Sequence, residues 1–425
     1  MWGLGARPLI LLMLLLGAAL PATAETVYPQ VTPGVELQFP RDEGAHPDFR
    51  IEWWYVTGWV QDEDAQPIGF QVTFFRVRPG LGETNPSRFA ARQILFGHAA
   101  IAEPAIGRLR HAERSARAGF DLAYAREGLT DVRLDDWSIR QDGDRYHTVV
   151  QGDDFLMRLD LDRVQPPLLQ GERGFSRKGP SPLAASYYYS LPQLQVSGEI
   201  VIDGRRRVVN GEAWFDHEWS SDVLDEQARG WDWMGINLDD GGALMAFRLR
   251  DGEGRARWAA ATLRSADGSV QTFGPEQVEW TPVRRWTSPR TGAEYPVQWR
   301  VKVGDREFDV QPLMDDAELD SRSSTGTIYW EGPVRLLGAG GAPLGRGYLE
   351  LTGYAGTNLK LLGAERIADV GRASLESLAE PARALLGAAV RERIRDDATL
   401  RHVLQPVITD RARGVQAFLD VARLE

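Results

Sequence analysis

The sequence predicts a mainly β protein whose antiparallel strands form barrels or sandwiches. Between residues 25 and 360, short alternating runs of apolar and polar residues are separated by turn dipeptides such as Asp142-Gly143 and Asp240-Gly241. Asp-Gly between such runs is a strong hairpin signal. The chain contains 14 tryptophans, most of them within these runs. Many short strands separated by regular turns are typical of antiparallel barrels and sandwiches.

Residues 1–24 have the features of a secretory signal peptide. Arg7 supplies a positive charge, an apolar run extends from Leu9 to Leu20, and Ala22-Thr23-Ala24 is a small-x-small cleavage signal. Because the apolar run is short for a bilayer span, we expect cleavage and export to the periplasm or the exterior. An uncleaved anchor is the alternative.

The composition argues against several partners and chemistries. The formal net charge is -11, which disfavours nucleic acid and anionic membrane surfaces as partners. The chain has no cysteine, so thiol catalysis and thiolate metal ligation are excluded. The sequence contains no Walker loop, Rossmann fingerprint, Gly-x-Ser-x-Gly elbow or His-Glu-x-x-His motif. We therefore expect neither a metal nor a cofactor.

Two segments look like copies of one hairpin and predict two related β-domains. Residues 54–76 and 231–248 each contain aromatics, a glycine, a strand, a turn and a second strand that ends in Phe-Arg. We place the domains at residues 25–200 and 201–360. A loop rich in proline and glycine at 165–182 lies shortly before the boundary between them. That loop is either a lid or a plain connection. Chance likeness between aromatic hairpins is the alternative to a repeat.

From Leu361 the apolar pattern becomes helical. Apolar residues recur at helical spacing, and Pro381 and Pro406 interrupt the run. We expect residues 361–425 to form a short helical tail that packs against a barrel. Docking of an envelope protein partner through this tail is the alternative.

The segment 211–221 contains an acid, an imidazole and a second acid between tryptophans. These candidate catalytic residues are Asp216, His217 and Glu218. Side chains alternate along a strand, so Asp216 and Glu218 share one face and His217 lies on the other. The three groups therefore do not converge, which weakens a metal site built from them.

The two faces of this segment predict different roles. His217 lies between Phe215 and Trp219, which indicates a cavity wall with one proton carrier. The face of Asp216 and Glu218 either orients the histidine or lines a second polar pocket. A buried His–Asp pair that only closes a barrel mouth is the structural alternative.

The motif Glu52-Trp53-Trp54-Tyr55 and His98 provide further candidates. A glutamate beside indoles can have a raised pKa and donate a proton. A structural ion pair between Glu52 and Arg76 is the alternative, and it is the commoner outcome for an isolated glutamate in a strand. His98 lies among small and apolar residues, where a histidine is more often a satisfied core residue than a catalyst.

At these motifs the chain resembles the secreted lipocalin-like proteins of the AttH and CrtC type, which are related to carotenoid 1,2-hydratases and labelled as predicted secreted hydrolases. The matching pieces lie at residues 52–58, 69–76, 187–198, 211–220, 230–241, 328–334 and 347–354. The set is specific, whereas any single piece would be weak. The predicted helical tail lies outside the resemblance.

The resemblance implies two lipocalin-like β-barrels packed together, with a ligand cavity at or near their junction. Such relatives add water to isolated double bonds of carotenoids without a cofactor, and related fungal folds hold polyenes for pericyclic ring closure. In the hydratases an acid is thought to protonate the alkene, and the histidine and tryptophan of their Asp-His-x-Trp motif match His217 and Trp219. Their downstream Tyr-x-Asp pair is replaced by Phe247-Arg248-Leu249, which argues against carotenoid hydration itself.

These inferences predict an exported, cofactor-independent enzyme of the hydrolase or hydratase type that acts on a hydrophobic small molecule of the polyene or lipid class. His217, with Asp216 or Glu218, would move the proton. The residues expected to bind the ligand are Trp54, Tyr55, Trp219, Trp231, Trp233, Glu52 and His98. The alternatives are a non-catalytic carrier of a lipophilic ligand, a common role of lipocalin barrels, and an envelope accessory protein.

Overall fold

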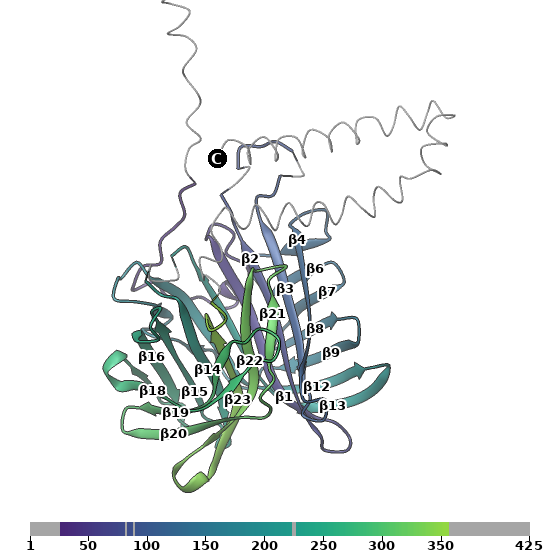
Figure 1. The fold of residues 1–425 in the computed structure, drawn as a ribbon. Coiled ribbons are helices and arrows are strands. Elements are labelled where there is room, and N and C mark those ends of the chain that lie inside the picture. The colour runs from purple at the N-terminus through teal and green to yellow at the C-terminus, as the bar shows by residue number, and fades with distance from the viewer. Residues whose placement is uncertain (1–25, 81–82, 88–89, 223–226, 357–425) are drawn as a thin grey trace, which may run out of the picture.

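Two antiparallel β-sheets make up nearly all of the regular structure (Figure 1). The structure, a computed structural model, describes residues 26–80, 83–87, 90–222 and 227–356. The predicted signal peptide at 1–24 and the predicted helical tail at 361–425 lie outside the described residues. The prediction of a mainly β protein is confirmed.

Sheet A contains the first thirteen strands. They are β1 (Ile51–Gln61), β2 (Pro67–Val77), β3 (Ile94–Ala102), β4 (Leu109–Arg117), β5 (Ala123–Ala125), β6 (Asp131–Leu134), β7 (Trp137–Asp142), β8 (Arg145–Gln151), β9 (Phe155–Asp162), β10 (Leu168–Leu169), β11 (Phe175–Arg177), β12 (Ala185–Ile202) and β13 (Arg205–Ser220). Their order is β4-β3-β2-β1-β13-β12-β9-β8-β7-β6-β5, with β10 and β11 paired to β12. Because β3 and β4 also approach β6, sheet A is a nearly closed barrel.

Sheet B contains the ten strands that follow. They are β14 (Gly230–Leu238), β15 (Ala243–Arg250), β16 (Ala256–Arg264), β17 (Val270–Phe273), β18 (Val278–Thr287), β19 (Glu294–Val303), β20 (Arg306–Pro312), β21 (Glu318–Ser321), β22 (Thr327–Leu337) and β23 (Pro343–Thr352). Their order is β17-β16-β15-β14-β23-β22-β20-β19-β18, with β21 paired to β22.

The helices among the described residues are single 3-10 turns. They are η1 (Arg41–Glu43), η2 (Pro275–Gln277) and η3 (Ala339–Gly341). None of them has the length and apolar character needed to cross a membrane.

The two hairpins that look alike in sequence occupy corresponding places in the two sheets. In sheet A the order β2-β1-β13 joins the hairpin to the last strand of that sheet, and in sheet B the order β15-β14-β23 does the same. The pairing registers also correspond, because Glu52 lies opposite Arg76 and Asp232 lies opposite Arg248. The likeness of the sequences therefore extends to the topology around each hairpin.

The chain passes from sheet A to sheet B between Ser220 and Gly230, later than the boundary expected at residues 200 and 201. Strand β13 stays in sheet A because it pairs with β12 on one side and β1 on the other. Asp203 and Gly204, inside the region expected to separate domains, both have positive φ. They form the tight turn between β12 and β13, as two-residue hairpin turns require.

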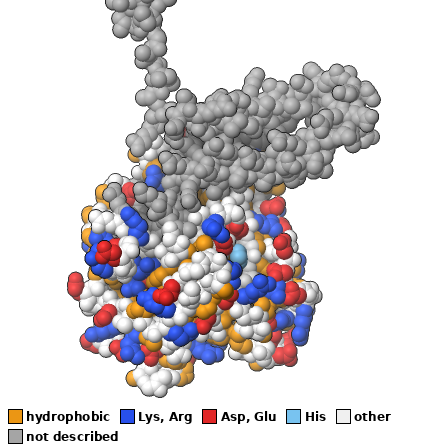
Figure 2. Space-filling view, in the orientation of Figure 1, with side chains coloured by type: hydrophobic (Ala, Val, Ile, Leu, Met, Phe, Trp, Pro, Cys, Tyr) orange, Lys and Arg blue, Asp and Glu red, His pale blue; other side chains and the backbone are white. Residues whose placement is uncertain are grey.

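The sheets have separate cores and one shared apolar cluster. The core of sheet A includes Trp54, Trp137 and Phe215, and that of sheet B includes Trp299 and Trp330. The shared cluster combines Tyr55, Tyr188 and Trp214 of sheet A with Trp233, Phe247 and Tyr348 of sheet B. Outside these cores, acidic and basic side chains are interspersed on the face shown in Figure 2.

Candidate functional site

Strand β13 carries a different polar centre on each of its faces. The pairing with β1 sets Trp54 opposite His217 and Tyr55 opposite Asp216. Side chains alternate, so His217 and Trp54 face the interior of the sheet A barrel, whereas Asp216, Glu218 and Tyr55 face sheet B. The prediction that the acids and the imidazole do not converge agrees with this geometry.

Glu52 is the centre of the cluster inside the barrel. Its carboxylate accepts a hydrogen bond from Arg76 Nε at 2.9 Å and lies 2.7 Å from His46 Nδ1 and 2.9 Å from His217 Nε2. Burial opposes ionisation of Glu52, but the Arg76 charge, His46 and the His217 hydrogen bond hold its pKa well below the usual range. Glu52 is therefore the structural ion pair considered above, and the raised pKa considered for it was wrong.

His217 is fully enclosed by this cluster. Its Nδ1 lies 3.2 Å from the Tyr189 hydroxyl, and its ring stacks on Trp54 with centroids 4.9 Å apart. Burial lowers the pKa of His217, although Glu52 acts in the opposite direction. Trp219 stacks on His46 with centroids 3.7 Å apart, so Trp54 and Trp219 pack within the barrel.

The cluster has the spacing of metal ligands but lacks the charge for a metal. Among the described residues, one group of three has such spacing: ligand atoms of His46, Glu52 and His217 lie within 4.8 Å of one another. Arg76 already neutralises Glu52 at 2.9 Å, and its guanidinium would repel a cation placed there. These residues fit a buried ion pair better than a metal centre.

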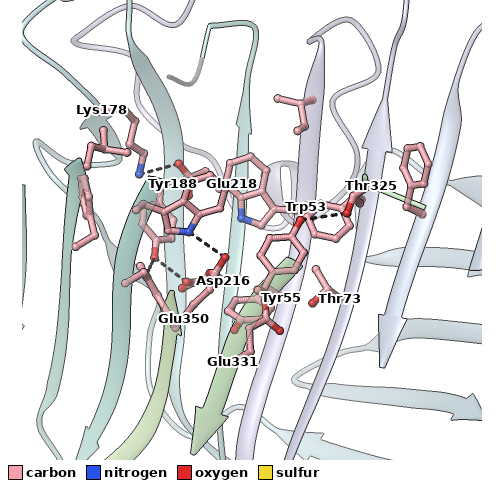
Figure 3. Close-up of a pocket in the computed structure, with 18 residues that line it drawn as sticks. Trp53, Tyr55, Thr73, Lys178, Tyr188, Asp216, Glu218, Thr325, Glu331 and Glu350 are labelled. Carbon is pink, nitrogen blue, oxygen red and sulfur yellow. Dashed lines mark hydrogen bonds and ion pairs between the residues drawn. The ribbon is translucent and has the colours of Figure 1, made fainter. Parts of the chain in front are cut away.

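A pocket lies on the other face of β13, between the two sheets (Figure 3). Its empty volume is about 1110 Å³ including the open mouth. Much of its wall is aromatic, formed by Trp53, Phe75, Phe96, Trp231, Trp233 and Phe247. Four acids also line it, namely Asp216, Glu218, Glu331 and Glu350. An apolar pocket with a few convergent polar groups is the usual form of a ligand site.

Asp216 is held in place by three hydrogen-bond donors. Its Oδ1 accepts from Ser190 Oγ at 2.5 Å and from Trp214 Nε1 at 2.7 Å, and its Oδ2 accepts from the Tyr188 hydroxyl at 2.6 Å. Tyr188 in turn accepts from Trp233 Nε1 at 3.1 Å. Burial raises the pKa of Asp216 to about 7 despite these donors. The carboxyl can therefore either hold or release a proton near neutral pH.

Glu331 and Glu350 form a pair of acids that sequence reasoning missed. They lie directly opposite each other on β22 and β23. Trp231 Nε1 donates to Glu350 at 2.9 Å, whereas Glu331 Oε2 has no hydrogen-bond partner among the described residues. Burial raises the pKa of Glu350 to about 8, and burial together with the charge of Glu350 raises that of Glu331 well above its usual range.

A sequence signal for this acid pair existed. Glu331 follows Tyr329-Trp330 within a predicted strand, which is the same pattern of a lone acid beside aromatics that drew attention to Glu52. Nothing in the sequence placed Glu350 beside it, because that requires the pairing of β22 with β23.

Glu218 is held as an ion pair at one side of the pocket. Lys178 Nζ lies 2.8 Å from its carboxylate, and the Ser186 hydroxyl donates to the same group. The ammonium also lies over the rings of Tyr188 and Phe247, at 4.7 Å and 4.4 Å from their centroids. The positive charge of Lys178 is thus balanced by Glu218 within the pocket wall.

The structure brings together only part of the predicted site. Tyr55, Trp231, Trp233, Asp216 and Glu218 line the pocket. Glu52, Trp54, His217 and Trp219 lie inside the barrel, so His217 does not meet Asp216 or Glu218. His98 lies in neither of these two places. Its Nε2 lies 2.9 Å from Ser324 Oγ, and burial lowers its pKa to about 3.

Fold and site together define a mainly β protein of two antiparallel sheets, one of them a nearly closed barrel, with an aromatic, acid-lined pocket between them. The model of the AttH-like family matches residues 30–354, and the chain belongs to this family. No curated protein matched the chain.

Solved structures with similarity to this one include the following two. The crystal structure of a protein assigned to AttH from Nitrosomonas europaea is 54% identical, with a TM-score of 0.72, and the match covers 77% of this chain and 99% of that one. Kievitone hydratase from Nectria haematococca is 14% identical with a TM-score of 0.58, and the match covers 77% of this chain and 96% of that one. At that identity the second likeness concerns the fold alone.

Proposed function

We propose that the protein is a cofactor-independent enzyme of the hydratase or hydrolase type, acting on a hydrophobic small molecule in the pocket between its sheets. One observation carries the proposal: three carboxyls with raised pKa values, the buried Asp216 and Glu331 and the half-buried Glu350, lie in an aromatic wall. Such carboxyls retain protons near neutral pH and can donate them to a bound substrate. Membership of the AttH-like family and the fold shared with a hydratase support the proposal.

Hydration of a double bond is the reaction that this arrangement suits best. Asp216 donates a proton to one alkene carbon, and its carboxylate is then stabilised by the hydrogen bonds of Ser190, Tyr188 and Trp214. Positive charge that develops on the other carbon is met by indole faces in the wall. Water attacks that carbon, and the proton that it loses returns to the carboxylate.

This proposal assigns the proton to Asp216, where the sequence favoured His217. The reason is access, because Asp216 lines the pocket and His217 is enclosed by Glu52, Tyr189 and Trp54. The features of a signal peptide predicted at residues 1–24 support the periplasm or the exterior as the proposed location.

The test is turnover in water labelled with oxygen-18. Linear terpenes, prenylated phenols and unsaturated fatty acids are incubated with the full mature chain, and products that gain labelled water are detected by mass spectrometry. Asp216→Asn should lower kcat by ~100-fold or more, the usual contribution of a general acid, while ligand affinity changes little. Asp160→Asn, on the half-exposed side of β9, is the matched control.

Each outcome of this assay separates the hypotheses. Wild-type turnover that survives Asp216→Asn would remove Asp216 from the mechanism. Tight binding of these molecules with no labelled product would make the protein a carrier of lipophilic ligands.

A further inference from the structure

Two oxygen atoms in the pocket wall have no hydrogen-bond partner among the described residues. They are the Tyr55 hydroxyl and Glu331 Oε2. Both residues are only 5% exposed, and both line the pocket. Buried polar groups in native proteins are nearly always bonded, because an unmade hydrogen bond costs about 1–3 kcal/mol. Two such atoms in one pocket therefore indicate a place where a ligand supplies the missing partner.

The other acids of the wall and its lysine already have partners. Asp216 is held by three donors, Glu350 by the indole of Trp231, and Lys178 is paired with Glu218. The unpartnered atoms therefore mark one position in the pocket. Figure 3 shows Tyr55 and Glu331 on the same side of the pocket.

This position lies next to the proposed proton donor. Tyr55 on β1 and Asp216 on β13 are directly opposite each other in the strand pairing, with both side chains in the pocket. Tyr55 and Glu331 are neighbours, because burial and then Glu331 raise the pKa of the Tyr55 hydroxyl. Neither atom is bonded to the other, which leaves room for an oxygen atom that bonds to both.

We propose that Tyr55 and Glu331 form a subsite for one hydroxyl oxygen: the attacking water during hydration, and the alcohol of the product or of the reverse substrate. This proposal rests on the proposed function. Asp216 gives its proton to the alkene, the π electrons form the new C–H bond, water forms the C–O bond, and the proton released from that water returns to Asp216. Atoms and electrons balance as alkene plus water gives alcohol.

The subsite also defines the class of ligand. A hydrocarbon leaves both atoms unsatisfied, and a carboxylate would bring a charge into an apolar wall whose lysine, Lys178, is already paired with Glu218. A neutral alcohol with an apolar body satisfies the pair and fills the aromatic wall. The pocket therefore prefers alcohols of the terpenoid type over the alkenes formed from them by loss of water.

A matched pair of probes tests this preference without turnover. Linalool and myrcene differ by one molecule of water, and their binding to the full mature chain is measured by calorimetry and by quenching of tryptophan fluorescence. Linalool should bind about tenfold more tightly, as expected for one or two additional hydrogen bonds. Tyr55→Phe and Glu331→Leu should each reduce the affinity for linalool several-fold and leave that for myrcene unchanged.

The control removes the same atom elsewhere. The Tyr146 hydroxyl is also buried without a hydrogen-bond partner among the described residues, but Tyr146 lies in the core of the sheet A barrel and is not among the residues that line the pocket. Tyr146→Phe should therefore leave the preference for linalool intact. If Glu331→Leu does not fold, Tyr55→Phe decides the matter alone.

Three results would overturn the subsite: equal affinity of the wild type for both probes, a preference that survives Tyr55→Phe, or no binding of either probe up to its solubility. The proposed function fails separately, when no substrate gains labelled water even though the alcohol preference is present.

Discussion

The two faces of strand β13 place buried acids in opposite situations. On the barrel side, Glu52 meets Arg76, His46 and His217, and its pKa is lowered. On the pocket side, no arginine of the described residues pairs with Asp216 or Glu350, and burial raises their pKa to about 7 and about 8. The comparison teaches that a guanidinium, more than burial itself, decides whether an acid in this protein is part of the scaffold or available for proton transfer.

Sheet B repeats the scaffold arrangement at the corresponding register. Asp232 lies 2.6 Å from Arg248 Nε and 3.0 Å from Arg250 Nε, and the Tyr354 hydroxyl donates to it at 2.9 Å. Because the acid–arginine pair occurs in both hairpins, it belongs to the common architecture of the two sheets. The pocket acids Asp216, Glu331 and Glu350, by contrast, do not form an acid–arginine pair of this kind among the described residues.

The largest expected effect concerns the barrel side. Glu52→Gln leaves the fully buried Arg76 without its counter-charge, so the free energy of unfolding should fall by about 3–5 kcal/mol. Urea unfolding followed by fluorescence measures this. Asp160→Asn, which affects a half-exposed pair with His147, should change stability by about 1 kcal/mol or less. A comparably small effect of Glu52→Gln would contradict the scaffold role.

On the pocket side, the contribution of Asp216 to the free energy of unfolding should fall as the pH rises. Asp216 has a raised pKa, so its contribution to stability is complete below pH 3.8 and is lost as the pH rises through about 7. Asp216→Asn should therefore remove roughly 4 kcal/mol of the decline in unfolding free energy between pH 4 and pH 8. Unfolding curves across that range test this. Parallel pH profiles for the wild type and the variant would show that the carboxyl is not held protonated.

The stabilising contribution of Glu52 should depend on pH in the opposite direction to that of Asp216. Its pKa is lowered, so its stabilising contribution is present above the ordinary glutamate pKa and is lost as the pH falls. The two centres should therefore destabilise the protein at opposite ends of the pH range.

A smaller effect on stability than that of either acid substitution, Glu52→Gln or Asp216→Asn, is expected for His217→Ala. Loss of its contacts with Glu52 and Tyr189 and the cavity left behind should cost about 2–3 kcal/mol. Ligand affinity should be unchanged, because His217 does not line the pocket. Differential scanning calorimetry and probe binding check the two statements. Intact stability with abolished turnover would return the proton-carrier role to His217.

Periodicity alone predicted much of this division. Alternation placed Asp216 and Glu218 apart from His217, and the pair of Glu52 with Arg76 followed from ordinary strand chemistry. Which face is the open one could not be predicted, because it depends on how sheet B packs against sheet A. For the same reason Glu331 and Glu350, far along the chain from Asp216, were not associated with it.

The pocket is built from residues of both sheets, which bears on how the site could have arisen. Asp216 and Tyr55 come from sheet A, whereas Glu331 and Glu350 come from sheet B. If the matching hairpins record the duplication of an ancestral gene, no single copy contained this site, and the chemistry began only when two copies were joined. In the present protein the interior of the sheet A barrel is filled by its apolar core and the Glu52 cluster, so the proposed ligand site lies between the sheets and not inside a barrel.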